Sequence, residues 1–332
     1  MLYRKIGNTN LNASVIGLGT WVMGGWMWGG ADDKESINTI HASLDAGINL
    51  IDTAPVYGFG KSEEVVGKAI RDRRDKVILA TKCGLRWDFE KGVLHFTSDV
   101  NGISDEEDAM KVYKYLGPES IREEVEISLK RLQTDYIDIY QTHWQDESTL
   151  IEDSIAELIK LRDEGKIVAI GASNASVDQL KQYSELQVDQ EKFNMLERKA
   201  EKSGNVKYCL ENNISVLAYS TMALGLLTGK ITPDRKFGDG DLRKNNHWFS
   251  TENIIKVNAM LNELNEISIE SNINSAQLVL AWSYNQPGIT HLLCGARTMD
   301  QALSNAKAGN VALSNEQIRL IDKTYVKYFG IS

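Results

Sequence analysis

Each of three short apolar runs in this sequence ends at an ionisable residue, and a tyrosine follows the first of these residues five positions later. If the runs are parallel strands, their carboxyl ends meet at one edge of a sheet, so the side chains that end them lie close together. The four residues concerned are Asp52, Tyr57, Lys82 and His143.

These four residue types could together make a proton donor. A tyrosine hydroxyl has a reference pKa of about 10, which is too high for an efficient acid at neutral pH. A neighbouring ammonium group, here that of Lys82, would favour the phenolate and lower that pKa. A buried lysine in turn needs a carboxylate such as Asp52 to remain charged. His143 could then hydrogen-bond the oxygen of a substrate.

Structural explanations exist for each of these residues taken singly. An aspartate after a strand often caps the next turn, and a lone tyrosine, lysine or histidine near a strand end is more often structural. Independent structural residues have no reason to share one rim, so the four together favour a catalytic site. The remaining histidines have no comparable context and are interpreted as structural: His41, His95, His247 and His291.

The elements that would position these residues alternate between strand and helix. Buried strands are expected at 15–20, 48–52, 76–81, 136–141, 166–171, 187–190, 214–218 and 289–293. Helices are expected at 34–46, 62–72, 118–132, 151–164, 176–185, 203–212, 253–271, 274–284, 298–308 and 314–327. Residues 2–14 are expected to form a short β-hairpin around a turn-rich centre.

Strands that are each followed by a helix require parallel pairing. In a chain of 332 residues this pattern predicts a single α/β domain spanning residues 1–332, a (β/α)8 TIM barrel with an N-terminal β-hairpin. The alternative is an open doubly wound sheet, which usually carries the pattern GxGxxG after its first strand. The segment Gly17–Val22 lacks the third glycine of that pattern, so we favour the barrel.

Two connections exceed the usual ~2–6 residues of α/β units, namely 83–117 and about 221–250. Both follow strands, so these long βα loops lie on the C-terminal face, where barrel enzymes build active sites. Tryptophans gather in the loops of this face and are expected to line a substrate pocket. The candidates are Trp21, Trp28, Trp87, Trp144 and Trp248, although packing of the long loops would explain about half of the tryptophans equally well.

A second set of polar residues follows the later strands. Amide and hydroxyl side chains suit a neutral ribose or carboxamide, and a tyrosine face suits a flat ring. These residues are Ser173, Asn174, Gln190, Tyr219 and Ser220. After the last strand, Gly295 permits close approach to the backbone, the next helix N-terminus favours an anion, and Arg297 adds a guanidinium for a phosphate.

Composition restricts the classes of partner. The chain carries 37 Lys and Arg against 46 Asp and Glu, a net charge of −9, without a basic block, so nucleic acid and anionic membranes are poor candidates. Its three cysteines are far apart and form no CxxC, which is typical of a reduced intracellular protein. We find no signal peptide, no apolar run of about 18 residues and no metal-ligand spacing such as HExxH. We therefore expect a cytoplasmic protein without a metal site.

Several motifs resemble the aldo-keto reductase family, along nearly the whole chain. The strongest are GINLIDTAPVYG at 47–58 with SEE at 62–64, LKRLQTDYID at 129–138, GKI at 165–167, IGASN at 170–174 and GLLTGK at 225–230. The soluble bacterial branch with general-stress and inositol-utilisation members is the most similar. The resemblance implies a barrel that uses NADPH, with NAD possible, to reduce an aldehyde or ketone to an alcohol without a metal. The substrate would be a sugar or another small carbonyl compound.

The resemblance also implies a role for each site residue. The catalytic tetrad would be Asp52, Tyr57, Lys82 and His143, with Tyr57 as the general acid, Lys82 and Asp52 as its tuners, and His143 orienting the carbonyl. Ser173, Asn174 and Gln190 would hold the nicotinamide carboxamide, and Tyr219 would stack on the ring. The other cofactor contacts would come from Gly19, Thr20, Trp21, Asp52, Ser220, Thr221, Leu224, Gly225, Lys230, Arg243, Gly295, Arg297, Gln301 and Asn305.

Some positions depart from the family pattern. Thr221 stands where a proline usually follows the Tyr-Ser pair, and Ser304 stands where a glutamate usually precedes the asparagine at 305. Both positions touch the expected cofactor edge, so the assignment of Arg297 to a 2′-phosphate, and with it the preference for NADP over NAD, is weakened. The segment 85–117 is long for the family and is expected to shape a substrate pocket of its own.

Two other classes of function remain as alternatives. Lys82 could be the nucleophile of a Schiff-base lyase, although the cofactor-like rim argues against this. Some relatives that resemble this family, such as potassium-channel β subunits, are regulatory partners, and an intact tetrad does not exclude such a role. Oligomeric state and the physiological direction of the reaction are left open by the sequence.

Overall fold

Eight parallel strands form a closed barrel in the computed structural model, which describes residues 1–99, 102–104 and 109–330. In their order around the barrel they are β10 (Ile167–Ser173), β11 (Val188–Lys192), β12 (Ser215–Tyr219), β13 (Ile289–Gly295), β3 (Ile16–Gly19), β4 (Leu50–Asp52), β5 (Ile78–Cys83) and β9 (Ile137–Thr142). The predicted barrel is confirmed. The open doubly wound sheet is excluded because the last strand, β13, pairs in parallel with the first, β3.

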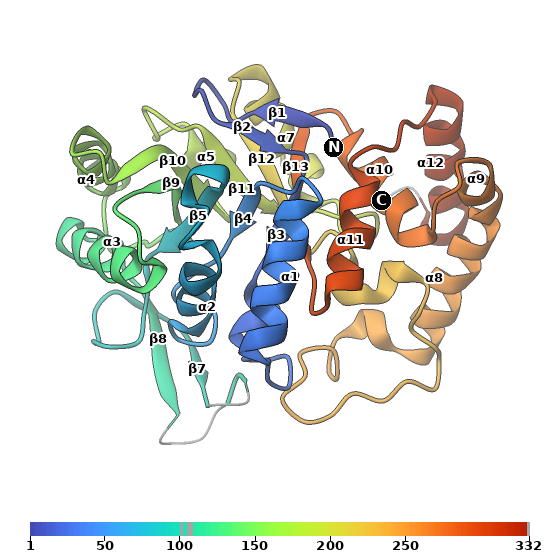
Figure 1. Ribbon diagram of the computed structural model, residues 1–332, viewed down its shortest axis with the longest axis horizontal. Helices are drawn as coiled ribbons and strands as arrows, with labels where there is room; N and C mark the ends of the chain where they lie inside the picture. Colours follow the sequence, from blue (N-terminus) through green and yellow to red (C-terminus); the bar gives the residue numbers. More distant parts are fainter. Residues whose placement is uncertain (100–101, 105–108, 331–332) are drawn as a thin grey trace.

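Helices surround this barrel (Figure 1). Their bounds are α1 (Asp33–Asp45), α2 (Lys61–Ile70), α3 (Pro118–Leu132), α4 (Ile151–Asp163), α5 (Val177–Leu180), α6 (Lys199–Lys202), α7 (Asn205–Glu211), α8 (Thr251–Glu263), α9 (Asn265–Glu270), α10 (Ser275–Tyr284), α11 (Met299–Ala308) and α12 (Asn315–Phe329). Side-chain caps fix several starts: Asp32 accepts a hydrogen bond from the Glu35 amide, and Ser314 forms a capping box with Gln317. None of the described helices is long and apolar enough to cross a bilayer.

Three predicted helices are shorter or broken in the structure. The helix expected at 176–185 is only α5, after which the chain turns inward at the buried Tyr183. The helix expected at 203–212 is α7, and Gly204, with a φ of 88°, separates it from the short α6. The helix expected at 253–271 is divided into α8 and α9 at Leu264. Periodicity alone did not reveal these breaks, because the apolar spacing continues across them.

The N-terminal hairpin closes one end of the barrel. β1 (Tyr3–Lys5) pairs antiparallel with β2 (Asn12–Ser14), as predicted. Ile6 and Ala13 have no exposed surface, and they belong to the apolar cluster that fills the barrel interior, together with Leu50, Ile139 and Leu217. A second and larger apolar cluster lies between the strands and the surrounding helices.

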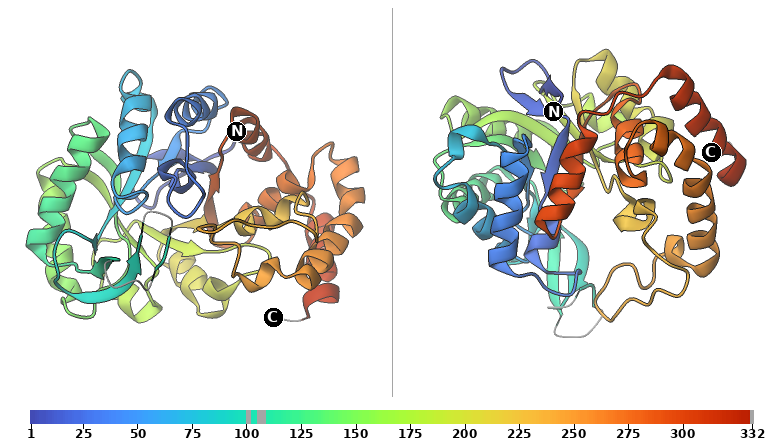
Figure 2. Two further views of the ribbon diagram at one scale, coloured as in Figure 1. Left: turned by 90° about the horizontal axis from the view of Figure 1, so that it is seen from below. Right: turned by 45° about the vertical axis from the view of Figure 1, so that its right-hand side comes forward.

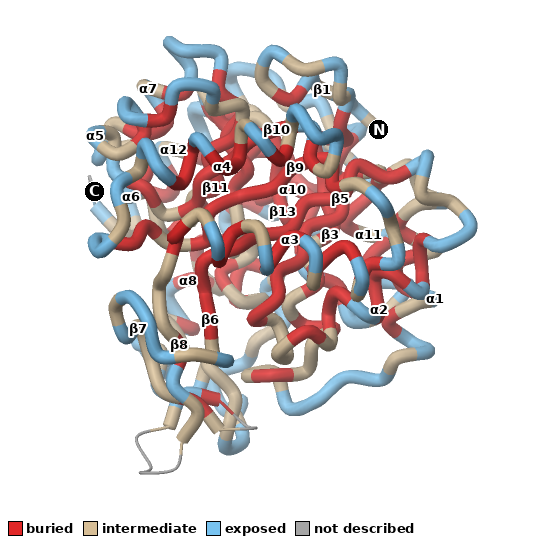
Figure 3. The backbone as a smooth tube through the Cα atoms, turned by 90° about the vertical axis from the view of Figure 1, so that its left-hand side faces the viewer, coloured by how far each residue is buried: buried red, intermediate tan, exposed pale blue. Residues whose placement is uncertain are grey.

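The segment 83–117 contains a three-stranded antiparallel sheet, where only a long loop was expected. β6 (Leu85–Arg86) and β7 (Val93–Ser98) both pair with β8 (Met110–Lys114). Only Ser98 of β7 is buried, so this strand lacks the apolar run that identifies the barrel strands. Figure 3 shows β7 and β8 projecting, mostly tan and pale blue, from the red barrel. Residues 100, 101 and 105–108 of the predicted loop lie outside the described residues.

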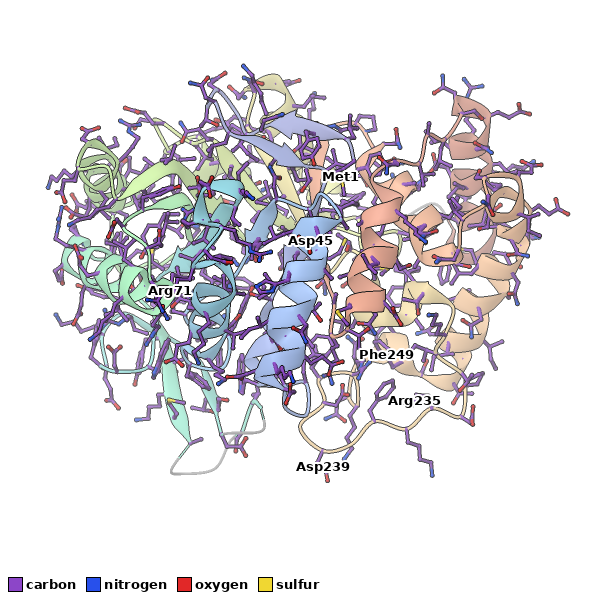
Figure 4. The ribbon with its side chains drawn as sticks, in the orientation of Figure 1. Met1, Asp45, Arg71, Arg235, Asp239 and Phe249 are labelled. Carbon is purple, nitrogen blue, oxygen red and sulfur yellow. The ribbon has the colours of Figure 1, made fainter. Side chains whose placement is uncertain are left out.

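The second long connection follows β12. It contains the 3-10 turns η3 (Ala223–Thr228) and η4 (His247–Phe249), with an irregular stretch between them. Asp239 is exposed and projects from the outer edge of this stretch, whereas Phe249 packs toward the core (Figure 4). Both long connections lie at the end of the barrel opposite the hairpin, and they are seen from that end in Figure 2 (left).

Candidate active site

Lys82 lies at the centre of the four ionisable residues. Its side chain on β5 has no exposed surface, and its ammonium donates to the Asp52 carboxylate at 2.8 and 3.0 Å. The same nitrogen donates to the Thr53 carbonyl at 2.9 Å and to the Tyr57 hydroxyl at 3.3 Å. Parallel pairing of β4 with β5, in which Asp52 stands opposite Ala80, brings these side chains together. The buried ammonium is therefore matched by a carboxylate, as a buried charge requires.

A tight turn between β4 and α2 holds Tyr57. The backbone of this turn passes so close to Gly24 that only glycine fits at position 58. A Cβ atom on Gly58 would lie 2.3 Å from the Gly24 carbonyl oxygen. Gly58 also has a φ of 68°, which side chains with a Cβ rarely adopt. Beneath the turn, the hydroxyls of Thr20 and Ser62 are hydrogen-bonded at 2.8 Å. Tyr57 is thus presented by a rigid segment.

His143 follows β9 and faces Tyr57. Its amide donates to the Cys83 carbonyl at 2.9 Å, and its own carbonyl accepts a hydrogen bond from Asn174 Nδ2 at 3.0 Å. The imidazole is nearly perpendicular to the Tyr57 ring, at 83°, with the ring centroids 5.9 Å apart. The two rings therefore border the same region at the mouth of the barrel.

Burial controls the protonation of this group. Loss of hydration, reinforced by the Asp52 carboxylate, raises the pKa of Tyr57 well above its usual value, so the hydroxyl keeps its proton at neutral pH. Although the sequence led us to expect Lys82 to lower this pKa, burial and the Asp52 carboxylate raise it. Burial, followed by the charges of Lys82 and His95, lowers the pKa of His143 well below its usual value. Burial also lowers the pKa of Lys82, against the opposing effect of Asp52.

A second hydrogen-bonded group adjoins the tetrad. Asn174 Nδ2 donates to the Ser173 hydroxyl at 3.0 Å, and Asn174 Oδ1 accepts a hydrogen bond from the Tyr219 hydroxyl at 2.8 Å. Gln190 Nε2 donates to Asp52 Oδ1 at 2.8 Å, which connects this group to the tetrad. A carboxamide needs a donor and an acceptor side by side, and these amide and hydroxyl groups supply both. The structure thus brings together the residues that the sequence suggested for this task.

The first strand contributes the opposite wall. Gly19 pairs with Asp52 on one side and with Gly295 on the other. The Thr20 hydroxyl donates to the Asp52 carbonyl at 2.9 Å. The Trp21 ring stacks on Tyr57 at 5.9 Å, and its buried indole N–H has no hydrogen-bond partner in the described part of the chain. Because a buried donor without a partner is costly, this N–H is well suited to a ligand acceptor.

The turn after β12 carries several predicted cofactor residues to the rim. Ser220, Leu224 and Gly225 have φ angles of 55, 56 and 95°, and a Cβ atom on Gly225 would meet nothing within 4 Å. Thr221 differs, because its hydroxyl is buried and donates to a β13 carbonyl at 3.4 Å. Lys230 is exposed just beyond the turn. The backbone of this turn, more than the Thr221 side chain, is therefore available to a ligand.

Two arginines from distant parts of the chain lie on Trp28. The Cζ atoms of Arg243 and Arg297 are 5.5 and 5.7 Å from its ring centroid. Arg243 donates to Asp241 at 2.6 and 2.9 Å, and Arg297 donates to the Trp28 carbonyl. Burial and then the charge of Arg243 lower the pKa of Arg297, while Asp241 and Glu35 act in the opposite direction. An anionic phosphate would relieve the repulsion between the two guanidiniums.

The N-terminus of α11 completes this corner. Gln301 Oε1 accepts a hydrogen bond from the Arg297 amide at 2.7 Å, and Asn305 Nδ2 donates to the Gly295 carbonyl at 3.3 Å. A cavity of about 490 Å³ adjoins this helix start and is lined by Asp32, Lys34, Glu35, Asn38, Thr298, Met299 and Asp300. A helix N-terminus beside paired arginines suits phosphate. Carboxamide groups at one end and cationic groups at the other fit a nicotinamide dinucleotide.

The predicted pocket tryptophans are not all in one place. Trp21 stacks on Tyr57, and Trp28 meets Trp21 edge-on at 5.7 Å. Trp87 and Trp144 pack, as does Tyr57, against a small apolar cluster beneath the three-stranded sheet. Trp248 instead contacts Phe329 of α12, with ring centroids 5.9 Å apart, and packs on the main core.

Sequence reasoning missed two residues near the tetrad. His95, interpreted as structural, lies on β7 with its ring 5.0 Å from that of Trp144, and its charge affects the pKa of His143. Glu63 is fully buried behind Lys82, where it accepts a hydrogen bond from the Thr81 hydroxyl at 2.8 Å. The SEE motif at 62–64 was a signal for Glu63. No signal marked His95, because β7 has no buried apolar run.

Comparison with known proteins agrees with this geometry. The model of the aldo/keto reductase family matches residues 15–326. The chain belongs to the aldo/keto reductase family. It is 41% identical to the aldo-keto reductase YhdN of Bacillus subtilis (strain 168), over 95% of this chain and 91% of that protein. It is also 41% identical to the NADH-specific methylglyoxal reductase of Escherichia coli (strain K12), over 95% of this chain and 96% of that protein.

A solved structure extends the agreement to three dimensions. The glycerol dehydrogenase AKR11B4 from Gluconobacter oxydans superposes with a TM-score of 0.87 at 38% identity, covering 99% of this chain and 97% of that one. As an aldo/keto reductase, the protein is an oxidoreductase of the class that reduces carbonyl compounds with NAD(P)H. Among the described residues, no cluster of three or more His, Cys, Asp or Glu side chains is arranged to hold a metal ion.

Proposed function

We propose that this protein reduces the carbonyl group of a small aldehyde or ketone to an alcohol, with Tyr57 as the proton donor. One observation carries the proposal: Lys82 Nζ contacts both the Asp52 carboxylate and the Tyr57 hydroxyl inside a buried site. A lysine used as a Schiff-base nucleophile would need a free amine, whereas this ammonium is engaged by a carboxylate, a carbonyl and a phenol.

The tetrad residues have complementary tasks in this proposal. The raised pKa of Tyr57 keeps its proton in place until a carbonyl oxygen accumulates negative charge. When the proton leaves, the ammonium of Lys82 stabilises the phenolate, and Asp52 keeps that lysine charged. His143, neutral because its pKa is lowered, can donate a hydrogen bond that orients the carbonyl without competing for the proton. A nicotinamide, when bound, would supply the hydride.

Residues of the rim would hold that cofactor. Ser173, Asn174 and Gln190 would bind the carboxamide, and Tyr219 would stack on the ring. Ser220, Leu224, Gly225, Lys230 and Arg243 would meet the pyrophosphate, with Thr221 contributing through its backbone, and Gly295, Arg297, Gln301 and Asn305 would meet the adenosine end. Gly19, Thr20 and Trp21 would border the nicotinamide beside Asp52.

We propose NADPH as the preferred form, with NADH as the alternative. The paired guanidiniums of Arg243 and Arg297 favour an additional phosphate. Three carboxylates line the cavity beside them, Asp32, Glu35 and Asp300, and these would favour unphosphorylated ribose hydroxyls. A relative 41% identical to this chain is named for NADH specificity. The dissociation constants for NADPH and NADH will show whether the arginines or the carboxylates decide the preference.

The proposed substrate is a small carbonyl compound that fits between aromatic rings. Trp21, Phe59, Trp87 and Trp144 surround the region of Tyr57 and His143. The names of two relatives, a methylglyoxal reductase and a glycerol dehydrogenase, point to small oxygen-rich compounds. Rigid aromatic walls restrict the size of the substrate more than its chemistry.

Substitution of Tyr57 tests the proposal. Tyr57→Phe should lower kcat by at least about 100-fold, because general acids contribute roughly 10²–10⁴ in rate. Quenching of tryptophan fluorescence by NADPH and by NADH should give dissociation constants within about threefold of wild type. Tyr3→Phe, which removes a partly exposed hydroxyl at the hairpin end, is the matched control and should change neither. Equal loss of turnover and cofactor binding in Tyr57→Phe, or no binding of either cofactor by the wild type, would overturn the proposal.

A further inference from the structure

His95 is brought to the site by a local irregularity of β7. The pairing of β7 with β8 shifts register between Leu94 and Phe96, so His95 sits at a β-bulge. A bulge re-aims side chains that would otherwise alternate between the two faces of a strand. Here Leu94 is half exposed, Phe96 stacks on Trp26 at 5.7 Å, and His95 between them is partly buried. Two consecutive rings therefore face the protein at this point.

The position of the His95 ring is defined by its contact with Trp144. Its centroid is 5.0 Å from that of Trp144, with the planes tilted by 47°. Trp144 directly follows His143 in the chain, and burial, Lys82 and His95, in that order, lower the pKa of His143. His95 thus packs on the residue that follows His143, whose ring lies edge-on to that of Tyr57. The three-stranded sheet, which lies outside the barrel, supplies this ring.

The hydrogen-bonding capacity of His95 is unused within the described chain. Neither ring nitrogen has a hydrogen-bond partner among the described residues, and the residue retains some exposed surface. Burial and the charge of Lys114 lower the pKa of His95, so the ring is neutral at pH 7. A neutral imidazole offers one donor and one acceptor. Packing on Trp144 alone would be served equally well by phenylalanine, which has no polar atoms.

We infer that His95 binds the substrate through a second oxygen, and that the preferred substrates are small aldehydes or ketones carrying a hydroxyl or a second carbonyl. This inference rests on the proposed carbonyl reduction. Tyr57 and His143 are both directed to the reacting oxygen in that proposal, and aromatic rings form much of the surrounding wall. His95 gives this wall a polar group with free donor and acceptor capacity on the side of Trp144.

A pair of substrates that differ by one hydroxyl tests the inference. Wild type, His95→Phe and His95→Asn are compared on propanal and on 2-hydroxypropanal, with each cofactor at saturation. His95→Phe keeps a ring against Trp144 and should lower kcat/KM for 2-hydroxypropanal by about 5- to 10-fold, as expected for one hydrogen bond. Its kcat/KM for propanal should stay within about twofold of wild type. His95→Asn, which keeps a donor and an acceptor, should recover part of the loss.

The chain offers a matched control for this substitution. His247 also lies against a tryptophan, Trp248, with centroids 4.9 Å apart and planes tilted by 40°. His247→Phe therefore changes a similar ring pair in a different environment, and it should leave both substrates unaffected. Melting temperatures of all variants should be within a few degrees, which separates binding from folding.

The other possible results would contradict either the role of His95 or the proposed carbonyl reduction. Equal loss on both substrates would show that His95 is structural, and no loss on either would show that it does not meet the substrate. Either result would remove the inference and leave the proposed reduction intact. If the wild-type protein reduced neither substrate with either cofactor, and also failed on larger aldehydes, the proposed function itself would fall together with the inference.

Discussion

Lys82 is a charged side chain without exposed surface, and such a group persists only where partners compensate for its lost hydration. Its partners are Asp52, the Thr53 carbonyl and the Tyr57 hydroxyl. Burial and the Asp52 carboxylate raise the pKa of Tyr57 although the ammonium is close, so the hydroxyl keeps its proton at neutral pH. In the proposed reduction, the Lys82 ammonium would act only when a phenolate develops on Tyr57, as a preorganised charge that stabilises a transition state.

The protonation of His143 gives a prediction for the pH dependence of the reaction. Burial, followed by the charge of Lys82, lowers its pKa well below the usual value, so it stays neutral near pH 7. We therefore expect kcat for carbonyl reduction at saturating cofactor to show no acidic limb with an apparent pKa near about 6.5, the reference value for histidine. Stopped-flow rates measured from pH 5.5 to 8 provide the check. A fall in kcat centred near that pH would contradict the neutral His143.

Strand β11 directs some side chains into the barrel interior and others toward the surrounding helices. Gln190 faces the barrel interior and donates to Asp52, while Asp189 and Glu191, its neighbours in the strand, face the helix layer. Both carboxyl groups lie near Asn205 of α7, whose Nδ2 also donates to the Ala175 carbonyl at 2.7 Å. Burial raises the pKa of Asp189 to about 7, and burial together with Asp189 raises that of Glu191 to about 8.

These raised pKa values predict a stability that falls as pH rises. Between the unfolded pKa, near 4, and the folded pKa of about 7, the native state holds a proton on Asp189 that the unfolded state has lost, so folding weakens with increasing pH. From pH 5.5 to 7 the change is about 2 kcal/mol, at roughly 1.4 kcal/mol per pH unit. In Asp189→Asn the part of this loss due to Asp189 should be absent, while the part due to Glu191, whose pKa is raised chiefly by burial, should remain. Urea unfolding at pH 5.5 and 8.5 should therefore show a smaller difference in stability than in wild type.

The control for this measurement is an exposed aspartate. Asp178, with a side chain 89% exposed, lies at the start of α5, and Asp178→Asn should leave the wild-type difference between the two pH values unchanged. If Asp189→Asn showed the same difference as wild type, a raised pKa of Asp189 would not be a cause of the pH dependence.

At the scale of the whole molecule, one end of the barrel is closed by the hairpin and the other carries the candidate active site. The hairpin seals one end with Ile6 and Ala13, and the long connections lie at the other end (Figure 1). The tetrad lies with the long connections, at or just beyond the carboxyl ends of the strands. The hairpin is also tied to the distant end of the sequence, since the Leu2 amide donates to the Gly309 carbonyl at 2.8 Å. Stability and catalysis should therefore respond to different substitutions.

Ile6 provides the test of this separation. Ile6→Ala should reduce the free energy of unfolding by about 2–5 kcal/mol, because it leaves a cavity in the barrel interior. At a temperature where the variant remains folded, kcat should be unchanged, since the tetrad lies at the other end. Leu2→Ala, at a position 45% exposed, should change stability by less than about 0.5 kcal/mol. A fall in kcat without a loss of stability would show that the two ends are coupled.

The sequence by itself determined where the barrel strands end and that Asp52, Lys82 and His143 lie together at those ends. Short apolar runs and the periodicity of helices are local signals, and parallel pairing then forces Asp52, Lys82 and His143 to one rim whatever the detailed packing. The proximity of Asn174 to Ser173 and Tyr219 followed from the same rule.

Only the tertiary structure decided the placement of residues on elements without such local signals. His95 stands on a partly exposed strand of the three-stranded sheet, and its bulge depends on pairing with β8. Arg243 and Arg297 meet on Trp28 although they are far apart in the chain. Trp248 packs on Phe329 of α12, and no residue near Trp248 in the sequence predicts this contact. Contacts of this kind are set by the folding of distant segments onto one another, so they leave no trace in local periodicity.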